Sequence, residues 1–328
     1  MNNKPSGLSH LNNLIWGLLT ASGVVVCLAT LFGFLGKYSW FLDLFSHFRV
    51  QYLISLTILS TLLFLSRRRR TAIAFLGFAF VNLVLILPLY FGGQNTAPED
   101  STIIRAMFLN VSTQFGDSER VKEVVQDLNP DIIVLEEINS QWVENLAWLS
   151  NSHPYTLVQT REDNFGIGLF SKLPLVESEV AYIGGIGAPS LLITVNTGIT
   201  NLRVIATHTL PPTGAIYSRW RNKQLDQLSD FTKSSLPILL LGDLNTTPWS
   251  YYFKKLLKNT GLSNSSRGYG VQPTWPSFAP IFSIPIDHAL HSSDIVIVDR
   301  KIGPDVSSDH FPVIIDFTIL TEAKNITQ

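Results

Sequence analysis

The chain has 328 residues, of which 46% are hydrophobic and 15% are charged, and its formal net charge at pH 7 is −1. This length is sufficient for two structural units or for one large core. The single cysteine, Cys27, excludes an intrachain disulfide.

The charge is distributed unevenly along the chain. Up to Ala97 there are seven basic residues and one acidic residue, a net charge of +6, whereas the remaining 17 basic and 24 acidic residues give −7. The sequence therefore combines a basic, apolar front with an acidic remainder. A net charge of −7 argues against tight, non-specific binding of DNA by that remainder.

Three apolar runs occupy the front of the chain, at residues 14–35, 50–66 and 71–91. The first has about 22 residues without a charge, which is enough to cross a hydrocarbon core of roughly 30 Å, and the second is short. We predict a membrane anchor of three transmembrane helices at residues 1–91. The alternative is three buried helices of a globular fold.

Four consecutive arginines, Arg67–Arg70, separate the second and third runs and predict the topology of the anchor. Cytoplasmic turns carry an excess of basic residues, so we place this turn and the N-terminus in the cytoplasm. The third run then carries the remainder across the bilayer. The sequence predicts a multi-pass protein of the cell (inner) membrane with an extracytoplasmic domain at 103–320, between a linker at 92–102 and a tail at 321–328.

Within that domain, apolar runs bounded by turn formers predict strands that alternate with amphipathic helices. A helix after Asp117 or Ser118 has Val121, Val124, Val125 and Leu128 on one face, and the next helix has Tyr217, Trp220, Leu225, Leu228 and Phe231 on one face. A third helix covers Tyr251 to Asn259. The predicted strands are 104–112, 131–139, 165–172, 191–197, 202–209, the run from Pro237 to Asp243, 286–292 and 307–317.

Polar side chains occur where these apolar runs begin or end. They are Asn110, Glu137, His208, Asp243 with Asn245, Asp287, and Asp309 with His310. Singly, each has an ordinary interpretation, such as a turn former, a core histidine or a structural ion pair. Delivered together by separate strands, they predict one convergent site. Oxygen donors without cysteine favour Mg²⁺ or Mn²⁺ over zinc.

The spacing within two motifs refines this prediction. Asp243 and Asn245 are two residues apart in Gly-Asp-Leu-Asn, so both side chains point the same way on an extended backbone. Glu136 and Glu137 are neighbours, so only one of them is expected to enter the pocket. The spacing alone leaves open which one, and an Asx-rich turn is the alternative for residues 242–245.

In this order, the residues resemble those of the endonuclease/exonuclease/phosphatase superfamily of metal-dependent phosphoesterases, in particular a bacterial branch with membrane spans before the catalytic domain. The resemblance covers Ile103 to Ile319. It implies an α/β fold, a four-layer α/β/β/α sandwich. It also carries departures: Glu136 stands where glutamine is common, Thr209 replaces a leucine, and a tyrosine or arginine present in some nucleases has no clear counterpart.

The resemblance implies a role for each residue. Glu137, with Asn110 and Asp309 close by, binds the metal ion; His208 and Asn245 bind the phosphate; His310, oriented by Asp287, and Asp243 are the candidates to deprotonate or position the attacking water. The implied reaction is hydrolysis of a phosphodiester by attack of water. Which of Asp243 and His310 acts as the base stays open.

The substrate is left open among a lipid head group, a nucleic acid and a small phosphodiester. A basic patch of Arg219, Arg221 and Lys223 would favour nucleic acid, and the membrane anchor favours a lipid. An aromatic lip is a further possibility, although its residues are expected in the core: Trp249, Tyr251, Tyr252, Tyr269, Trp275 and Phe278. A catalytically silent, membrane-tethered binding module is the alternative from another class. No protein partner is predicted, and His153, His288 and His291 are interpreted as ordinary surface or strand positions.

Overall fold

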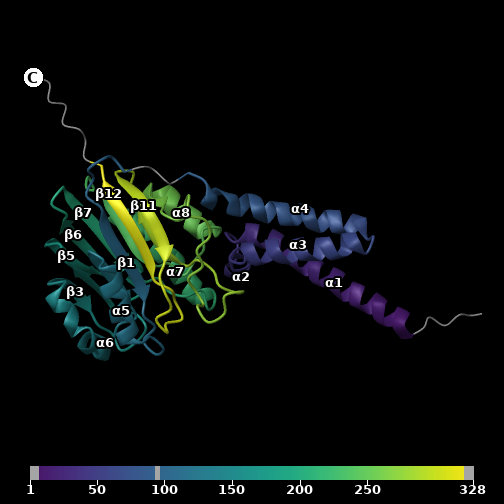
Figure 1. Ribbon diagram of the computed structural model, residues 1–328, viewed down its shortest axis with the longest axis horizontal. Coiled ribbons are helices and arrows are strands. Elements are labelled where there is room, and N and C mark those ends of the chain that lie inside the picture. Colours follow the sequence, from purple (N-terminus) through teal and green to yellow (C-terminus); the bar gives the residue numbers. More distant parts are fainter. Residues whose placement is uncertain (1–6, 93–96, 321–328) are drawn as a thin grey trace, which may run out of the picture. The chain divides into compact units, whose positions relative to one another are not determined.

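The computed structural model describes residues 7–92 and 97–320. The chain divides into a helical unit, which extends to Leu87 and takes in residues 249–251, and a larger α/β unit that begins at Pro88. Residues 93–96 of the predicted linker and the predicted tail at 321–328 lie outside the described residues. Each unit is described by itself (Figure 1).

The helical unit is built on a pair of packed helices, α3 and α4, joined by the arginine turn. Its core contains Leu56 and Leu63 of α3 and Phe75 of α4. Arg49, at the start of α3, is buried and donates through Nη1 to the carbonyl oxygen of Thr30 at 2.8 Å. The elements are α1 Gly7–Phe32, η1 Gly33–Leu35, α2 Trp40–Leu44, α3 Arg49–Leu65 and α4 Arg69–Ile86, followed by η2 Leu87–Tyr90.

Among the described residues, two helices rather than three have the length and apolar composition of a membrane span. They are His10–Leu35 and Arg69–Tyr90, whereas the helix predicted at 50–66 is the 17-residue Arg49–Leu65. At 1.5 Å per residue, 17 residues cover about 26 Å, which is short of a hydrocarbon core of roughly 30 Å. The prediction of three full-length spans is therefore corrected to two apolar helices of sufficient length and one shorter helix.

The α/β unit contains two mixed sheets of six strands each. One has the order β11-β12-β1-β2-β4-β3, and the other has the order β5-β6-β7-β8-β10-β9. Within them, β1–β2 and β7–β8 are the parallel pairs. The strands are β1 Ile104–Asn110, β2 Ile132–Glu136, β3 Tyr155–Gln159, β4 Ile167–Ser171, β5 Leu175–Ala181, β6 Ser190–Asn196, β7 Asn201–Thr207, β8 Ile238–Asp243, β9 Ser263–Asn264, β10 Asp287–His291, β11 Ile295–Ile302 and β12 Val313–Ile319.

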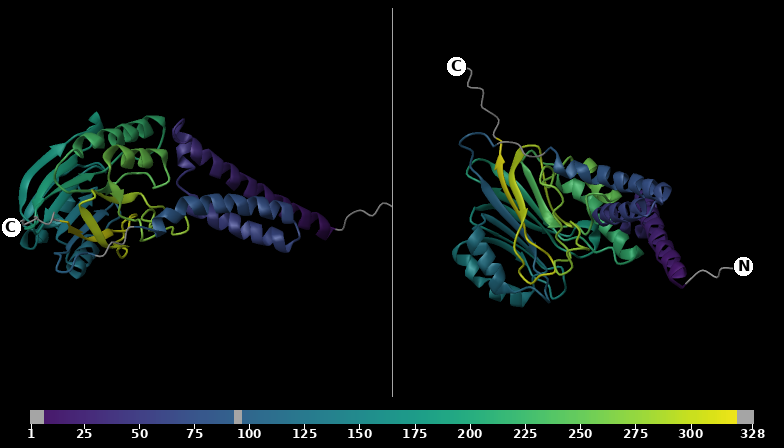
Figure 2. Two further views of the ribbon diagram at one scale, coloured as in Figure 1. Left: turned by 90° about the horizontal axis from the view of Figure 1, so that it is seen from above. Right: turned by 45° about the vertical axis from the view of Figure 1, so that its right-hand side comes forward.

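The two sheets pack face to face, and helices flank their outer faces (Figure 2). Residues from both sheets, among them Phe108, Val134 and Val204, form one buried apolar cluster. The outer face of the first sheet packs against α5 Ser118–Leu128 and α6 Ser140–Asn145, and that of the second packs against α7 Ala215–Phe231 and α8 Tyr251–Thr260. This is the predicted α/β sandwich with helices outside.

Several predicted elements differ from those in the structure. Residues 307–312 form a loop, because β12 begins only at Val313, so Asp309 and His310 lie before the strand. Strands β3, β5, β9 and β11 were not predicted; in β5, most residues are exposed, which removes the apolar run that marks a strand. Helix α5 is confirmed with its cap, since the Asp117 side chain accepts from the backbone N–H of Glu119 and Arg120.

Helix α7 turns a different face inward from the one predicted. Tyr217 and Trp220 are more than 40% exposed, whereas Ser218, Arg221 and Gln224 are buried together with Leu225 and Leu228. The proposed basic patch is therefore wrong, because the guanidinium of Arg221 lies inside the protein. Of the aromatic residues that were expected in the core, Trp249 is buried, but Phe278 is 78% exposed.

Candidate active site

The polar side chains at the strand ends meet because of the directions of the strands. β1 and β2 are parallel, so Asn110 and Glu136 end them as register partners. β7 and β8 are also parallel, and β10 runs antiparallel to β8, which pairs Asp287 at its start with Asp243 at the end of β8. Ends of parallel strands and starts of antiparallel ones therefore share the same edge.

Glu137, not Glu136, is the glutamate that faces Asn110. It has a left-handed backbone with φ of 62°, and Thr113 Oγ1 donates to its carbonyl oxygen at 2.7 Å. The Asn110 Nδ2 donates to Glu137 Oε1 at 3.0 Å. Such a backbone costs roughly 1–3 kcal/mol and is typical of functional sites. It turns the half-buried carboxylate of Glu137 into the pocket beside Asn110.

Glu136 lies beneath the pocket, fully buried. Its Oε2 accepts a hydrogen bond from the backbone N–H of Asp243 at 3.1 Å, and its Oε1 has no hydrogen-bond partner in the part of the chain that the structure describes. Burial, and then the charge of Asp243, raises the pKa of Glu136 well above its usual value. Burial therefore favours the protonated form of this acid, which lies on the far side of Asp243 from solvent and not beside Asn110.

The variant Glu136→Gln is expected to be more stable than the wild type at neutral pH. In the unfolded chain Glu136 ionises near pH 4.3, whereas burial raises its pKa in the folded protein, so its contribution to stability is full below about pH 4.3 and falls as the pH rises. Glutamine keeps an acceptor for Asp243 N and does not titrate. We expect a gain in stability at pH 7 that vanishes below about pH 4. Thermal melting of the full chain at several pH values measures it.

Asp243, Asp287 and His310 form a buried cluster. His310 Nδ1 lies 2.9 Å from Asp287 Oδ2, and His310 Nε2 lies 3.9 Å from Asp243 Oδ2. One possible ligand atom from each of the three residues lies within 4.8 Å of the others. Because Nδ1 is hydrogen-bonded to Asp287, Nε2 is the ring atom directed toward Asp243, so the imidazole is held in one orientation.

The buried charges shift one another's protonation. Burial, and then the charge of Asp287, raises the pKa of Asp243 well above its usual value. Burial lowers the pKa of His310, but the charge and hydrogen bond of Asp287 outweigh it and raise that pKa to about 10. His208, whose Nε2 is 3.6 Å from Asp243 Oδ2, has its pKa lowered to about 4 by burial and by the charge of His310. Without a metal ion, His310 is thus cationic at pH 7 and His208 is neutral.

Asn245 connects two loops of the site. Its backbone N–H donates to Asp243 Oδ1 at 2.8 Å, and its Nδ2 lies 2.8 Å from the Thr209 carbonyl oxygen and 3.2 Å from Asp243 Oδ2. Its φ is +47°, so this conformation is held by contacts. Asn245 therefore orients Asp243, and contact with a phosphate through Nδ2 requires that one of these bonds be exchanged.

Two side chains outside the predicted set of site residues hold members of that set in place. Thr113 Oγ1 fixes the Glu137 backbone, and Trp275 Nε1 donates to Asp309 Oδ2 at 3.0 Å. Ser308 Oγ donates to the Asn110 carbonyl oxygen at 2.7 Å and accepts from His310 N at 3.0 Å, which joins the terminal loop to β1. The sequence named Trp275 only as an aromatic residue of a possible lip, and no sequence signal pointed to Thr113.

Other histidines are structural rather than exposed. His288 and His153 are both buried. The His288 Nε2 lies 2.8 Å from the Thr246 carbonyl oxygen, the His153 Nε2 lies 2.9 Å from that of Pro130, and burial lowers the pKa of both rings. They take no part in the cluster, as predicted, but they belong to the interior rather than to the surface.

The donor chemistry of the site fits a divalent cation. Four acidic side chains, Glu137, Asp243, Asp287 and Asp309, gather here with the imidazole of His310, and burial raises the pKa of Glu137 despite the hydrogen bond from Asn110. Oxygen donors with one imidazole suit a hard ion, and the only cysteine is in α1. Glu137 and Asp309 are only partly buried, so they are the accessible donors, whereas Asn110 beside Glu137 is buried.

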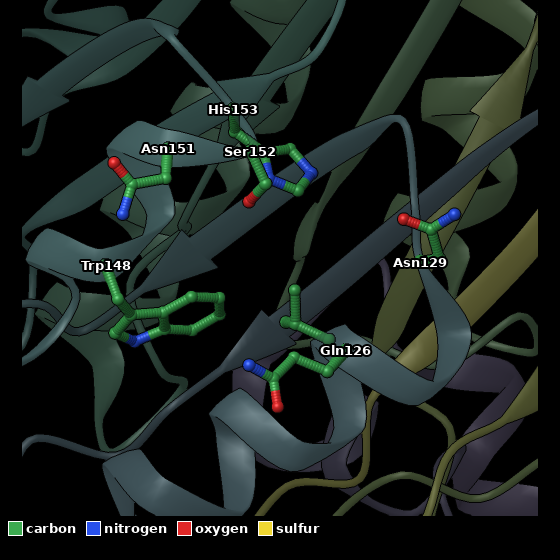
Figure 3. A pocket seen from close by; sticks show the side chains of 7 residues that line it. Gln126, Asn129, Trp148, Asn151, Ser152 and His153 are labelled. Carbon is green, nitrogen blue, oxygen red and sulfur yellow. The ribbon is translucent and has the colours of Figure 1, made fainter.

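Two cavities differ in their relation to this site. One, of about 360 Å³, lies between α5 and the segment 147–153, and none of the candidate site residues lines it (Figure 3). The other, of about 340 Å³, reaches Asp309 and is lined by Phe115, Ser277, Phe278, Asp305, Ser307, Ser308 and Asp309. Two aromatic rings and two carboxylates line this second cavity, and no basic residue does.

Comparison with known families gives a match over most of the α/β unit. The family described as "Endonuclease/Exonuclease/phosphatase family" matches residues 107–310. This range includes each of the predicted site residues, from Asn110 to His310. A search of curated proteins finds no significant match.

Several solved structures share the fold of the α/β unit. An endonuclease/exonuclease/phosphatase from Beutenbergia cavernae is 20% identical with a TM-score of 0.54, and the match covers 66% of this chain and 72% of that one. D. rerio TDP2 complexed with a single-strand DNA product is 16% identical with a TM-score of 0.55, and the match covers 66% of this chain and 99% of that one. Sphingomyelinase C from Streptomyces griseocarneus is 18% identical with a TM-score of 0.51, and the match covers 66% of this chain and 99% of that one. At these identities the likeness shows the fold and leaves the substrate open.

Proposed function

The chain belongs to the Endonuclease/Exonuclease/phosphatase family, and from this premise we propose that it is a membrane-anchored, metal-dependent phosphodiesterase that acts on a lipid-type phosphodiester. The observation that carries the proposal is the buried pair of His310 and Asp287, 2.9 Å apart, directed at Asp243 beside the Glu137–Asn110 contact. An imidazole held by one carboxylate and facing another is suited to moving a proton.

We assign separate roles to the residues that would bind the metal ion, the water and the phosphate. Glu137, oriented by Asn110, and Asp309, oriented by Trp275, would hold Mg²⁺ or Mn²⁺, which supplies positive charge to the phosphoryl oxygens and the leaving group. Asp243 and the Nε2 of His310, 3.9 Å apart, bracket the place where water is positioned, and to accept the proton of that water His310 must first lose the proton that it carries in the metal-free protein. Neutral His208 donates a hydrogen bond to a phosphate oxygen, and Asn245 contacts it by exchanging its bond to Asp243.

The cavity next to Asp309 supports a lipid head group over nucleic acid. A polynucleotide carries further phosphates on both sides of the cleaved bond, and such anions need basic partners. This cavity offers Phe115, Phe278, Asp305 and Asp309 instead, and no Lys or Arg lines it. Aromatic rings together with carboxylates favour an organic cation such as a quaternary ammonium group. The proposed substrate is therefore a phosphodiester with a cationic or apolar substituent.

The helical unit supports anchoring to a lipid bilayer, and we propose that the α/β unit is extracytoplasmic. Two helices have the length and apolar composition of a span. The arginine turn at 67–70 favours the cytoplasm, and the N-terminus shares that side if the short helix α3 returns the chain through a locally thinner bilayer. If α3 stays on one side, the N-terminus lies outside the cytoplasm instead, whereas the α/β unit, which follows α4, is extracytoplasmic in both arrangements. Reporter fusions after residue 328 that are active on only one side of the membrane test the position of the α/β unit, and fusions before residue 1 decide between the two positions of the N-terminus.

The activity is tested with the full chain in detergent micelles and Mg²⁺ or Mn²⁺. The substrates are sphingomyelin, phosphatidylcholine, phosphatidylinositol phosphates, plasmid DNA and bis(p-nitrophenyl) phosphate. Hydrolysis of the choline-bearing lipids that stops with a chelator and returns with the metal ion supports the proposal. Preferred cleavage of DNA identifies a nuclease instead. Metal binding without any hydrolysis points to a tethered binding module.

The variant Asp305→Asn is expected to weaken recognition of a cationic head group specifically. Asp305 is exposed at the cavity, so its attraction for the cation is partly screened by water and salt. We expect KM for choline-bearing lipids to rise about 3- to 10-fold, with kcat and the hydrolysis of bis(p-nitrophenyl) phosphate unchanged. Asp127→Asn, which removes an exposed carboxylate on α5, is the matched control. Equal effects of the two variants would reject the cavity as the head-group site.

A further inference from the structure

The buried face of α7 is polar over its first three turns. Ser218, Arg221 and Gln224 follow one another at helical spacing, and the apolar residues Leu225 and Leu228 take over further along. Arg221 and Gln224 are both fully buried. Charged and amide side chains are expensive to bury unless they make specific hydrogen bonds, so this part of the helix has requirements beyond packing.

Arg221 holds the loop that follows β8. Its Nη1 donates to the carbonyl oxygen of Asn245 at 2.9 Å, and its Nε and Nη2 donate to Asn222 Oδ1 at 3.1 and 2.9 Å. The guanidinium also lies over the ring of Tyr252 at 5.6 Å. The carbonyl group of Asn245 belongs to a residue with φ of +47° whose N–H and side chain both contact Asp243. Arg221 therefore fixes a strained residue that orients Asp243.

Gln224, one turn further along, holds the loop that follows β7. Its Oε1 accepts a hydrogen bond from the backbone N–H of Leu210 at 3.0 Å, two residues beyond His208. On its other side, Gly184 approaches so closely that a Cβ there would lie 2.7 Å from Gln224 Cγ. The side chain of Gln224 is therefore confined between the turn at 183–185 and the loop that follows β7. Its hydrogen bond fixes the distance between Leu210 and α7.

We propose that Arg221 and Gln224 are positioning residues, which together hold the His208 loop and the Asn245 loop in register on one rigid helix. The two loops also meet directly, since Asn245 Nδ2 donates to the Thr209 carbonyl oxygen at 2.8 Å. Helix α7 thus supports both the loop with His208 and the loop with Asn245, and both of these residues lie next to Asp243. This inference rests on the proposed function for its catalytic consequence, while the effect on loop order stands apart from it.

The test compares Arg221→Met, Arg221→Lys and Gln224→Met with the wild type, using the full chain in detergent and bis(p-nitrophenyl) phosphate. We expect Arg221→Met to lower kcat about 10- to 100-fold, because a displacement of about 1 Å has that effect. KM and the half-activating Mg²⁺ concentration should change little, since Glu137 and Asn110 are not touched. Arg221→Lys, which keeps one donor, should recover part of kcat. Arg219→Met, on the exposed side of the same helix, is the matched control.

Hydrogen exchange gives a readout that does not depend on activity. Deuterium uptake should rise at residues 244–247 in Arg221→Met and at 209–211 in Gln224→Met, and neither segment should change in Arg219→Met. If the wild type hydrolyses nothing, the proposed function fails, and the exchange data still decide the positioning role. Unchanged uptake in both loops, or an equal loss of kcat in Arg219→Met, would overturn the inference. If Arg221→Met does not fold, the uncharged substitution Gln224→Met decides it.

Discussion

The variant His310→Ala is expected to lose about 10²- to 10⁴-fold in kcat, the range that a positioned proton-transfer group contributes. The ring is buried, its Nδ1 is committed to Asp287 at 2.9 Å, and its Nε2 faces Asp243 at 3.9 Å. Alanine removes the one imidazole that this pair of carboxylates surrounds. Steady-state hydrolysis of bis(p-nitrophenyl) phosphate with saturating Mg²⁺ measures the loss.

A control and a titration separate this role from a structural one. His291→Ala removes an imidazole from the other end of β10, outside the cluster, and should keep kcat near that of the wild type. In the metal-free protein, the pKa of His310 near 10 should fall toward its ordinary value of about 6.5 in Asp287→Asn, since the charge that raises it is gone. Histidine NMR signals followed against pH report it. More than a tenth of the wild-type kcat in His310→Ala would rule out a proton-transfer role.

The contact between His310 and Asp287 also determines how the stability of the metal-free protein depends on pH. The pKa of His310 is raised in the folded protein, so its pairing with Asp287 stabilises the fold fully below about pH 6.5 and is lost as the pH rises through about 10. Glu136 adds to this trend, because its raised pKa also favours the folded state at low pH. Both groups therefore make the metal-free protein less stable at alkaline pH, and a bound cation would counter this by compensating the carboxylates.

The strand-end residues could be predicted because the rule behind them is simple. Apolar runs such as residues 238–241 are buried on both faces, and the first polar residue after each run marks the sheet edge. Strand direction then places Asn110 at the end of β1 and pairs Asp243, at the end of β8, with Asp287, at the start of β10. These positions do not depend on the loops. The loop residues Thr113 and Trp275 could not be found in this way, because their positions depend on backbone turns and long-range contacts.

The same reasoning fails where burial and polarity disagree. Arg221 was included in a possible basic surface patch, yet its hydrogen bonds to Asn245 and Asn222 make burial possible. Residues 50–66 were taken as a span although the run is short, and the helix likewise has only 17 residues. For Arg221 the carbonyl group of Asn245, distant in sequence, decided the outcome, and sequence periodicity does not record such partners.

The variant Glu137→Gln is expected to raise the half-activating concentration of Mg²⁺ by about 10²-fold or more, because it removes a charged donor, whereas changes of groups behind a metal ligand cost about 10- to 100-fold. Asn110→Ala, which removes only the hydrogen bond that orients Glu137, should therefore fall in that smaller range. The neighbouring substitution Glu136→Gln is the matched control and should leave metal dependence unchanged, since Glu136 is fully buried and contacts the backbone N–H of Asp243 rather than Asn110. Burial raises the pKa of Glu137, so protons compete with the metal ion and the required Mg²⁺ concentration should fall as the pH rises. Metal titrations of activity at several pH values measure both effects; an equal shift in Glu136→Gln and Glu137→Gln would show that the metal ion is held elsewhere.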